Sequence, residues 1–184
     1  MILVTVGTEL PFNRMVKVVD EWAAETNRTD VFAQIGKTDW EPSHIQFSNF
    51  LDPAEYSHFL ADAKVVIGHA GMGTILSALY LGKSILVMPR RASLREHRNE
   101  HQFATAQRLS DEGLVEVAYD DNELRMRLDA IDVLQPSRKI EQFAEPSLTT
   151  AIRSFIAEGH SSVGSTGRPF FGRGLVSALT RGSR

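Results

Sequence analysis

A short apolar run, a glycine-rich loop and a helical pattern follow one another without interruption between residues 64 and 80. The run Lys64–Gly68 contains three consecutive β-branched residues and predicts a buried strand. The loop His69–Thr74 has two glycines, and apolar residues then recur at helical spacing up to Tyr80. A strand that leads through a tight glycine loop into a helix is a building unit of α/β proteins, so this segment constrains the fold most strongly.

The same alternation of strand-like and helix-like patterns runs along most of the chain. Further strands are predicted at 2–6, 31–35, 45–50, 84–88 and 114–118, and further helices at 11–25, 54–63, 98–112, 120–128 and 148–156. This order predicts an α/β fold with a doubly wound, mostly parallel, Rossmann-like sheet and helices on both faces.

Two regions of different composition are predicted along the chain. Residues 1–158 are expected to form the α/β domain, and residues 159–184, rich in Gly, Ser and Arg, a flexible basic tail. Phe170 and Phe171 among the arginines leave a second interpretation open, in which the tail docks on a partner or on an anionic membrane surface.

Composition excludes several classes of protein. No cysteine is present, which removes disulfides, thiolate catalysis and cysteine-bound zinc. The whole chain has a formal charge of −3 and its tail has four arginines and no acid, so residues 1–158 carry −7. Such an acidic body argues against nucleic acid as a partner. No apolar run approaches the roughly 20 residues of a membrane span, and no signal peptide is evident, so we expect a cytoplasmic protein.

The loop His69–Thr74 has the chemistry of a phosphate site. Its glycines let the backbone approach a ligand closely, and the N-terminus of the following helix presents free N–H groups and a partial positive charge. The spacing differs from the dinucleotide fingerprint, because Leu76 stands where the third glycine would be. The pattern therefore favours a pyrophosphate site over a NAD site, and a purely geometric role of the glycines stays open.

A second polar cluster, Pro89–Gln102, follows the next predicted strand. We expect it near the glycine loop, because parallel strands bring their carboxyl ends to one edge of a sheet. Arg90 and Arg91 suit a phosphate or a uronate, and His, Asn and Gln side chains suit sugar hydroxyls. His97 and His101 are four residues apart, but a zinc site needs a third ligand that the sequence does not place. We predict no metal and no cofactor.

Taken together, four motifs resemble the C-terminal domain of the family-28 glycosyltransferases over about residues 1 to 130. They are Val4-Thr5-Val6-Gly7-Thr8, His69-Ala70-Gly71-Met72-Gly73-Thr74, Gly82-Lys83 with Pro89-Arg90-Arg91, and Glu96-His97 with His101-Gln102. Stand-alone members are the most similar: the catalytic subunit of the two-subunit eukaryotic dolichol-linked N-acetylglucosaminyltransferase, and bacterial exopolysaccharide and capsule subunits. The resemblance implies the C-terminal, donor-binding half of a GT-B fold.

The resemblance also implies roles for individual residues in a UDP-sugar site. Gly7 and Thr8 would face the cleft, with Arg90 and Arg91 near the diphosphate. The residues implied to hold the donor diphosphate are His69, Ala70, Gly71, Met72, Gly73 and Thr74. Those implied for the donor sugar are Asn99, His101 and Gln102, and Glu96 and His97 complete the predicted substrate-binding set. Ser77 stands where many relatives carry a ribose-binding glutamate, a departure that bacterial polysaccharide members often share.

The implied function is that of a donor-binding catalytic subunit. It would move a hexose-type sugar from a UDP-sugar to a lipid-linked saccharide acceptor, with inversion, together with a membrane-associated subunit that binds the acceptor. His69 is the predicted general base, Glu9 is a second candidate, and the base could also belong to the partner. A structural role of His69 in its loop stays open. So do two other functions, a self-sufficient sugar-nucleotide enzyme such as an epimerase and a non-catalytic nucleotide-sugar-binding module.

Overall fold

The computed structural model describes residues 1–141 and 146–161, and its strands form one fully parallel sheet in the order β3-β2-β1-β4-β5-β6. The strands in this part of the chain are β1 (Ile2–Thr5), β2 (Val31–Gln34), β3 (Gln46–Ser48), β4 (Val65–His69), β5 (Ser84–Met88) and β6 (Glu116–Val117). The predicted doubly wound α/β fold is therefore confirmed, with the strand order of a Rossmann sheet.

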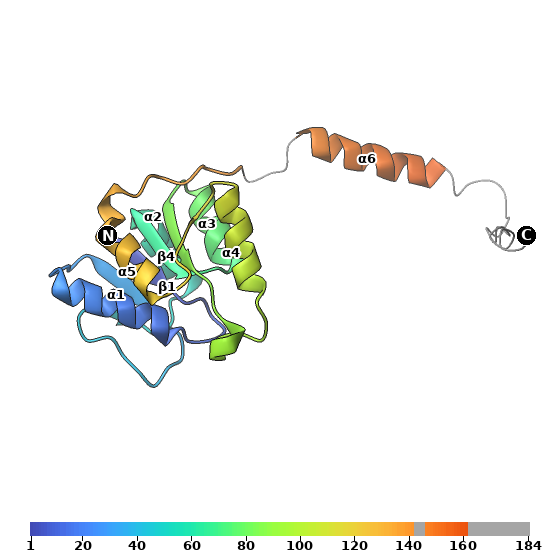
Figure 1. Ribbon diagram of the computed structural model, residues 1–184. Helices are drawn as coiled ribbons and strands as arrows, with labels where there is room; N and C mark the ends of the chain where they lie inside the picture. The colour runs from blue at the N-terminus through green and yellow to red at the C-terminus, as the bar shows by residue number, and fades with distance from the viewer. Residues whose placement is uncertain (142–145, 162–184) are drawn as a thin grey trace, which may run out of the picture. The chain divides into compact units, whose positions relative to one another are not determined.

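Helices cover both faces of this sheet. These helices are α1 (Asn13–Glu25), α2 (Pro53–Asp62), α3 (Met72–Tyr80), α4 (His101–Asp111) and α5 (Asp121–Asp129). A further helix, α6 (Pro146–Ser161), belongs to a separate part of the chain. The chain also contains two short 3-10 turns in its described residues, η1 (Ala92–Leu94) and η2 (Ile131–Val133). Helices α1 and α5 pack on one face, and α2, α3 and α4 on the other (Figure 1).

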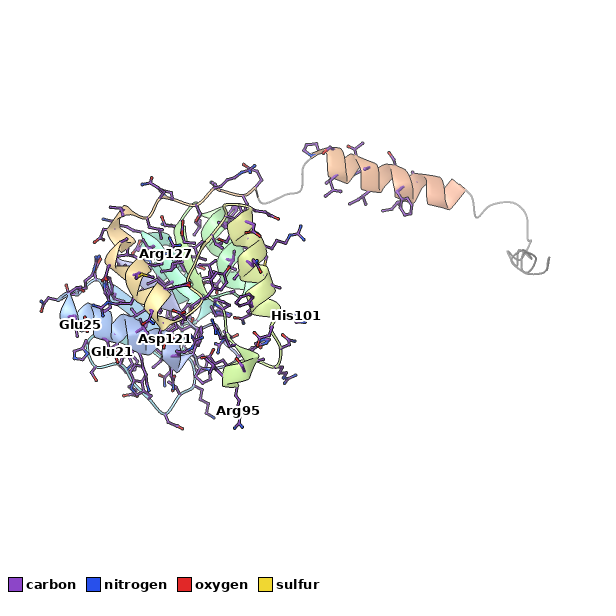
Figure 2. The ribbon with its side chains drawn as sticks, viewed as in Figure 1. Glu21, Glu25, Arg95, His101, Asp121 and Arg127 are labelled. Carbon is purple, nitrogen blue, oxygen red and sulfur yellow. The ribbon has the colours of Figure 1, made fainter. Side chains whose placement is uncertain are left out.

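The central strands are mostly apolar because both of their faces are buried. In β1, Ile2 and Val4 point into the core under α1 and α5, whereas Leu3 points into the core under α3. All five residues of β5 are buried in the same way. Each fully buried aliphatic side chain contributes about 1.5–3 kcal/mol, so these runs favour a two-sided core over a half-exposed sheet. The outer helix faces are charged, as Glu21, Glu25, Asp121 and Arg127 show (Figure 2).

Local side-chain bonds decide where two helices begin. At α2, Asp52 accepts hydrogen bonds from the amides of Ala54 and Glu55, and the Glu55 carboxylate accepts the Asp52 amide in return. At α4, the predicted start at residue 98 was wrong, and the helix begins at His101. There the Asn99 side chain accepts the His101 amide, so it offers the backbone an alternative to another helical turn.

The chain separates into two compact units, Met1–Gln142 and Phe143–Arg184. The first holds the whole sheet, and the second holds α6, which extends past the predicted range 148–156 at both ends. The predicted boundary at residue 158 stays a prediction, and the predicted tail lies outside the described residues from Ser162 onward. Within the described ranges, no helix combines the length and the apolar character that crossing a membrane requires.

Candidate functional site

A cavity of about 510 Å³ opens at the carboxyl ends of β1 and β4. These strands are neighbours in the sheet although β2 and β3 separate them in sequence, and the chain changes direction across the sheet there. Ligands of doubly wound proteins bind at this switch point, where diverging loops leave a crevice.

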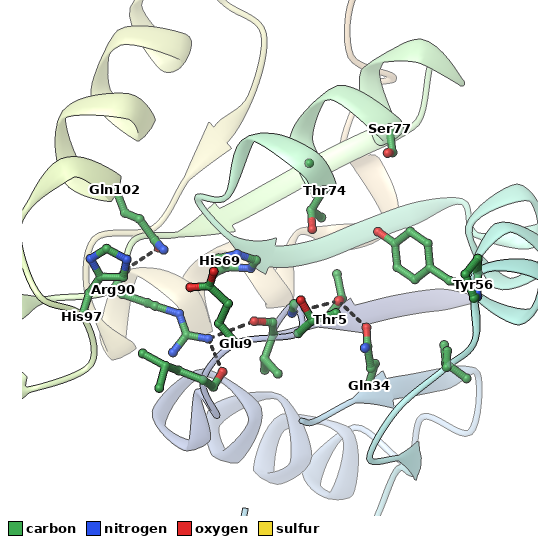
Figure 3. A pocket seen from close by; sticks show the side chains of 17 residues that line it. Thr5, Glu9, Gln34, Tyr56, His69, Thr74, Ser77, Arg90, His97 and Gln102 are labelled. Atoms are coloured by element: carbon green, nitrogen blue, oxygen red, sulfur yellow. Dashed lines mark hydrogen bonds between the residues drawn. The ribbon is translucent and has the colours of Figure 1, made fainter. Parts of the chain in front are cut away.

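The cavity has a middle and two chemically different ends (Figure 3). The middle is lined by Thr5 to Glu9, His69, Gly73 and Thr74. We call one end, formed by Arg90, His97 and Gln102, the polar end, and the opposite end, formed by Gln34, Tyr56 and Ser77, the aromatic end. Leu51 and Pro53, close to Tyr56 in the chain, also line the cavity. An elongated ligand with a charged centre and two unlike ends fits this arrangement.

The first turn of α3 supplies uncapped backbone amides to the middle of the cavity. Its N-cap, Gly71, has no side chain to accept a hydrogen bond from these amides. Gly73 lies in the cavity wall, and a Cβ atom there would meet no heavy atom within 4 Å. The backbone of this turn is thus open to a ligand, and the helix N-terminus favours an anion.

His69 lies between the two glycine loops and requires glycine on both sides. A Cβ atom on Gly7 would lie 2.7 Å from its Cε1, and one on Gly71 would lie 2.1 Å from its Nε2. Gly7 also has a φ of +76°, which disfavours other residues. Burial lowers the pKa of His69 to about 4, and the charge of Arg90 adds to this effect. The ring is therefore neutral at pH 7, and its Nδ1 has no hydrogen-bond partner among the described residues.

Arg90 shapes the wall of the cavity by holding the loop after β1. Its guanidinium donates hydrogen bonds to the carbonyls of Val6 at 2.9 Å, Leu10 at 2.6 Å and Pro11 at 2.6 Å. Arg90 is only 3% exposed, and this burial lowers its pKa to about 10, with Glu96 and Glu9 opposing the change. It stays charged at pH 7 and is the arginine that lines the cavity.

Glu96 and Arg91 were predicted to face the substrate, but neither lines the cavity. The Glu96 carboxylate pairs with Arg14 of α1 through two bonds of 2.7 and 2.9 Å and also accepts the Arg91 amide at 3.0 Å. The Arg91 side chain donates to the Tyr119 carbonyl, and its Nε is buried without a partner in the described part of the chain. In this structure both residues connect the loop after β5 to the rest of the domain through hydrogen bonds.

The other predicted residues of this segment divide between cavity and surface. Gln102 lines the cavity, and its Oε1 accepts the Arg90 amide at 3.1 Å. His97 also lines it, and its Nδ1 lies 3.2 Å from the side-chain oxygen of Asn99. Asn99 and His101 are exposed outside the cavity, and Figure 2 shows His101 at the outer surface.

The two predicted glycine loops, Gly7–Thr8 after β1 and His69–Thr74 after β4, contribute five of their eight predicted residues to the cavity. Gly7, Thr8, His69, Gly73 and Thr74 line the cavity. Ala70 is buried in the core, Gly71 supports the His69 ring, and Met72 is 45% exposed. Residues 1–141 and 146–161 contain no group of three or more acidic or histidine side chains that could hold a metal ion.

Sequence reasoning missed most of the aromatic end. Gln34 is 3% exposed at the carboxyl end of β2, and its Oε1 accepts a hydrogen bond from the Thr5 hydroxyl at 2.9 Å. Burial raises the pKa of Tyr56, and its interaction with the Thr74 side chain opposes this in part. One signal was available: a glutamine that ends an otherwise apolar strand beside the first glycine loop.

The sheet order and the cavity at its switch point, with the uncapped N-terminus of α3 in its wall, define a Rossmann-type α/β domain with the features of a site for an anionic ligand. Residues 1–155 match the model of the glycosyltransferase family 28 C-terminal domain, and the chain belongs to this family. A comparison with curated proteins gives no match.

Solved structures of glycosyltransferases share the fold. MurG of Acinetobacter baumannii has a TM-score of 0.58 at 17% identity over 85% of this chain and 49% of its own. The glycotransferase of kitacinnamycin has a TM-score of 0.55 at 19% identity over 87% of this chain and 39% of its own. ALG13, solved by NMR, has a TM-score of 0.54 at 17% identity over 77% of this chain and 90% of its own. The chain thus spans less than half of the first two proteins.

Proposed function

We propose that the chain is the donor-binding subunit of a UDP-sugar-dependent glycosyltransferase. The observation that carries this proposal is the cavity at the β1–β4 switch point, with uncapped amides of α3 in its wall. Membership of the family-28 C-terminal domain supports the same assignment. The diphosphate would accept hydrogen bonds from the first turn of α3, near Gly73 and Thr74, and the charge of Arg90 would stabilise the departing UDP. No metal ion or cofactor has a part in this proposal.

The rest of the active site would come from another protein. The chain spans less than half of MurG and of the kitacinnamycin glycotransferase. As the resemblance to stand-alone family members implies, we propose a membrane-associated partner that binds a lipid-linked saccharide, to which a hexose-type sugar is transferred with inversion, as in exopolysaccharide synthesis. The chain would work at the cytoplasmic face of the membrane.

The general base is better placed on the partner than on His69. With a pKa of about 4, His69 is neutral at pH 7 but is a weak proton acceptor. Its position between Gly7 and Gly71 instead supports a role in setting the distance between the two loops. Glu9 lines the cavity as well and remains the second candidate from this chain.

Calorimetric titration with UDP tests the donor site. The wild-type chain should bind UDP, and Gly73→Val should lose at least roughly tenfold in affinity, because its side chain would fill the space of the diphosphate. The substitution introduces no clash at its Cβ atom, since a Cβ atom at Gly73 meets nothing within 4 Å. Met72→Val is the matched control, because Met72 is the adjacent residue and does not line the cavity. No UDP binding by the wild type would overturn the proposal.

Incubation of the isolated chain with UDP-hexoses tests the need for a partner. The proposal expects neither a new sugar nucleotide nor free UDP in excess of a no-protein control. Formation of a C2- or C4-epimer by the chain alone would instead establish a self-sufficient sugar-nucleotide enzyme.

A further inference from the structure

The two ends of the cavity suit different halves of a sugar nucleotide. The polar end offers His97 and Gln102, which suit the many hydroxyls of a sugar. The aromatic end offers the ring of Tyr56, which suits a flat heteroaromatic base (Figure 3). Leu51 and Pro53, near Tyr56 in the chain, are further residues of the cavity wall. With the diphosphate at the first turn of α3, the nucleoside would therefore extend toward the aromatic end.

A short chain of hydrogen bonds holds Gln34 at this end. The Gly7 amide donates to the Thr5 hydroxyl oxygen at 3.2 Å, and the Thr5 hydroxyl donates to Gln34 Oε1 at 2.9 Å. Thr5 is 1% exposed and Gln34 is 3% exposed, so water does not compete for these bonds. Reversal of the Gln34 amide would leave the buried Thr5 hydroxyl without an acceptor among the described residues, which costs about 1–3 kcal/mol.

The direction of these bonds determines what Gln34 can offer a ligand. Its oxygen is occupied by Thr5, and its Nε2 has no hydrogen-bond partner within residues 1–141 and 146–161. Some side-chain atoms in that part of the chain are fully buried and lack a partner, but Nε2 is not one of them. Gln34 itself lines the cavity. Gln34 therefore presents a hydrogen-bond donor, and no acceptor, to whatever occupies the aromatic end.

We propose that Gln34 is a specificity-determining residue that donates a hydrogen bond from Nε2 to a carbonyl oxygen of the donor's pyrimidine base. This inference rests on the proposed function and adds base selection to it. Adenine offers no carbonyl oxygen and carries an amino group instead, so an adenine nucleotide would lack the carbonyl partner of Nε2. The bond chain also links base selection to the first glycine loop, because Gly7 and Gln34 share Thr5.

Competitive calorimetry with UDP, ADP and inorganic pyrophosphate tests this inference. Wild-type protein should bind UDP at least roughly tenfold more tightly than ADP. Gln34→Glu keeps the acceptor for Thr5 but replaces the donor by a carboxylate, and Gln34→Met removes the donor without adding charge. Both should weaken UDP binding by roughly tenfold and leave pyrophosphate binding within about twofold. Gln107→Glu, on the exposed side of α4, is the matched control and should bind UDP as the wild type does.

The outcomes separate the inference from the function on which it rests. If UDP and pyrophosphate both bind and the Gln34 variants keep wild-type UDP affinity, the base-reading role is overturned while the donor site stands. Equal loss of UDP and pyrophosphate binding in both variants also overturns it, because the effect would then be a general one on the cavity. If the wild type binds neither ligand, the proposed function fails and the inference fails with it. Thermal unfolding of each variant establishes that the protein tested is folded.

Discussion

The glycine loop after β4 and the polar loop after β5 were both predicted to contact the donor, yet the structure uses them differently. The first is placed by the backbone: it follows a central strand, and its Gly71 leaves room for the His69 ring. The second is placed by its side chains, since Glu96 pairs with Arg14 and Glu100 accepts the Ala92 amide.

This difference explains which predicted residues line the cavity. A loop held by its backbone leaves its amides and small side chains available to a ligand, as at Gly73. A longer loop needs its own polar side chains to satisfy buried backbone groups, so Glu96 is used for support. Residue type alone does not distinguish a polar side chain that binds a ligand from one that holds a loop.

The largest expected effect tests the contact between the glycine loop and His69. Gly71→Ala should destabilise the protein by about 3 kcal/mol, because the new Cβ would lie 2.1 Å from the imidazole. Denaturant unfolding measures this change, and in a His69→Ala background the same substitution should cost less than about 1 kcal/mol. Gly73→Ala is the control, since that Cβ meets nothing within 4 Å. Equal costs in both backgrounds would contradict the packing around His69.

A smaller effect should appear in the pH dependence of stability. The folded pKa of His69, about 4, lies below its ordinary value of 6.5, so the unfolded chain binds a proton that the folded chain does not. This contribution to stability is present above pH 6.5 and is lost as the pH falls toward 4. The free energy of unfolding should be measured at pH 7 and at pH 4.5. The decrease between these pH values should be about 2 kcal/mol smaller for His69→Asn than for the wild type. Parallel pH profiles for the two proteins would show that burial does not shift this pKa.

The smallest effect concerns the polar loop. Glu96→Gln should lower stability by about 1–2 kcal/mol, because the half-buried pair with Arg14 loses its charge but keeps its shape. Weakened support of the loop should reduce UDP affinity only a fewfold, measured by calorimetry. His101→Ala, at an exposed position, is the control and should change neither quantity. A loss of UDP binding with unchanged stability in Glu96→Gln would instead place this carboxylate on the ligand.

The fold was predictable because its signals are local. Apolar runs rich in β-branched residues marked β1, β4 and β5. The start of α4 was missed because the Asn99 side chain competes for the backbone amide, an interaction that periodicity does not report. The middle of the cavity was also foreseeable, since glycines after a central strand lie at the ligand-binding edge of any parallel sheet.

The sequence alone determined the α/β class, the mostly parallel sheet and the glycine loop His69–Thr74 after a central strand, because each follows from short-range patterns. Only the tertiary structure decided that Gln34 and Thr5 form a pair, since they stand on different strands brought together by the sheet. The tertiary structure alone also decided that Arg90 donates hydrogen bonds to three carbonyls of a loop distant in sequence, and that Glu96 pairs with Arg14. Partners of buried polar groups are chosen by three-dimensional proximity, which composition and spacing do not encode.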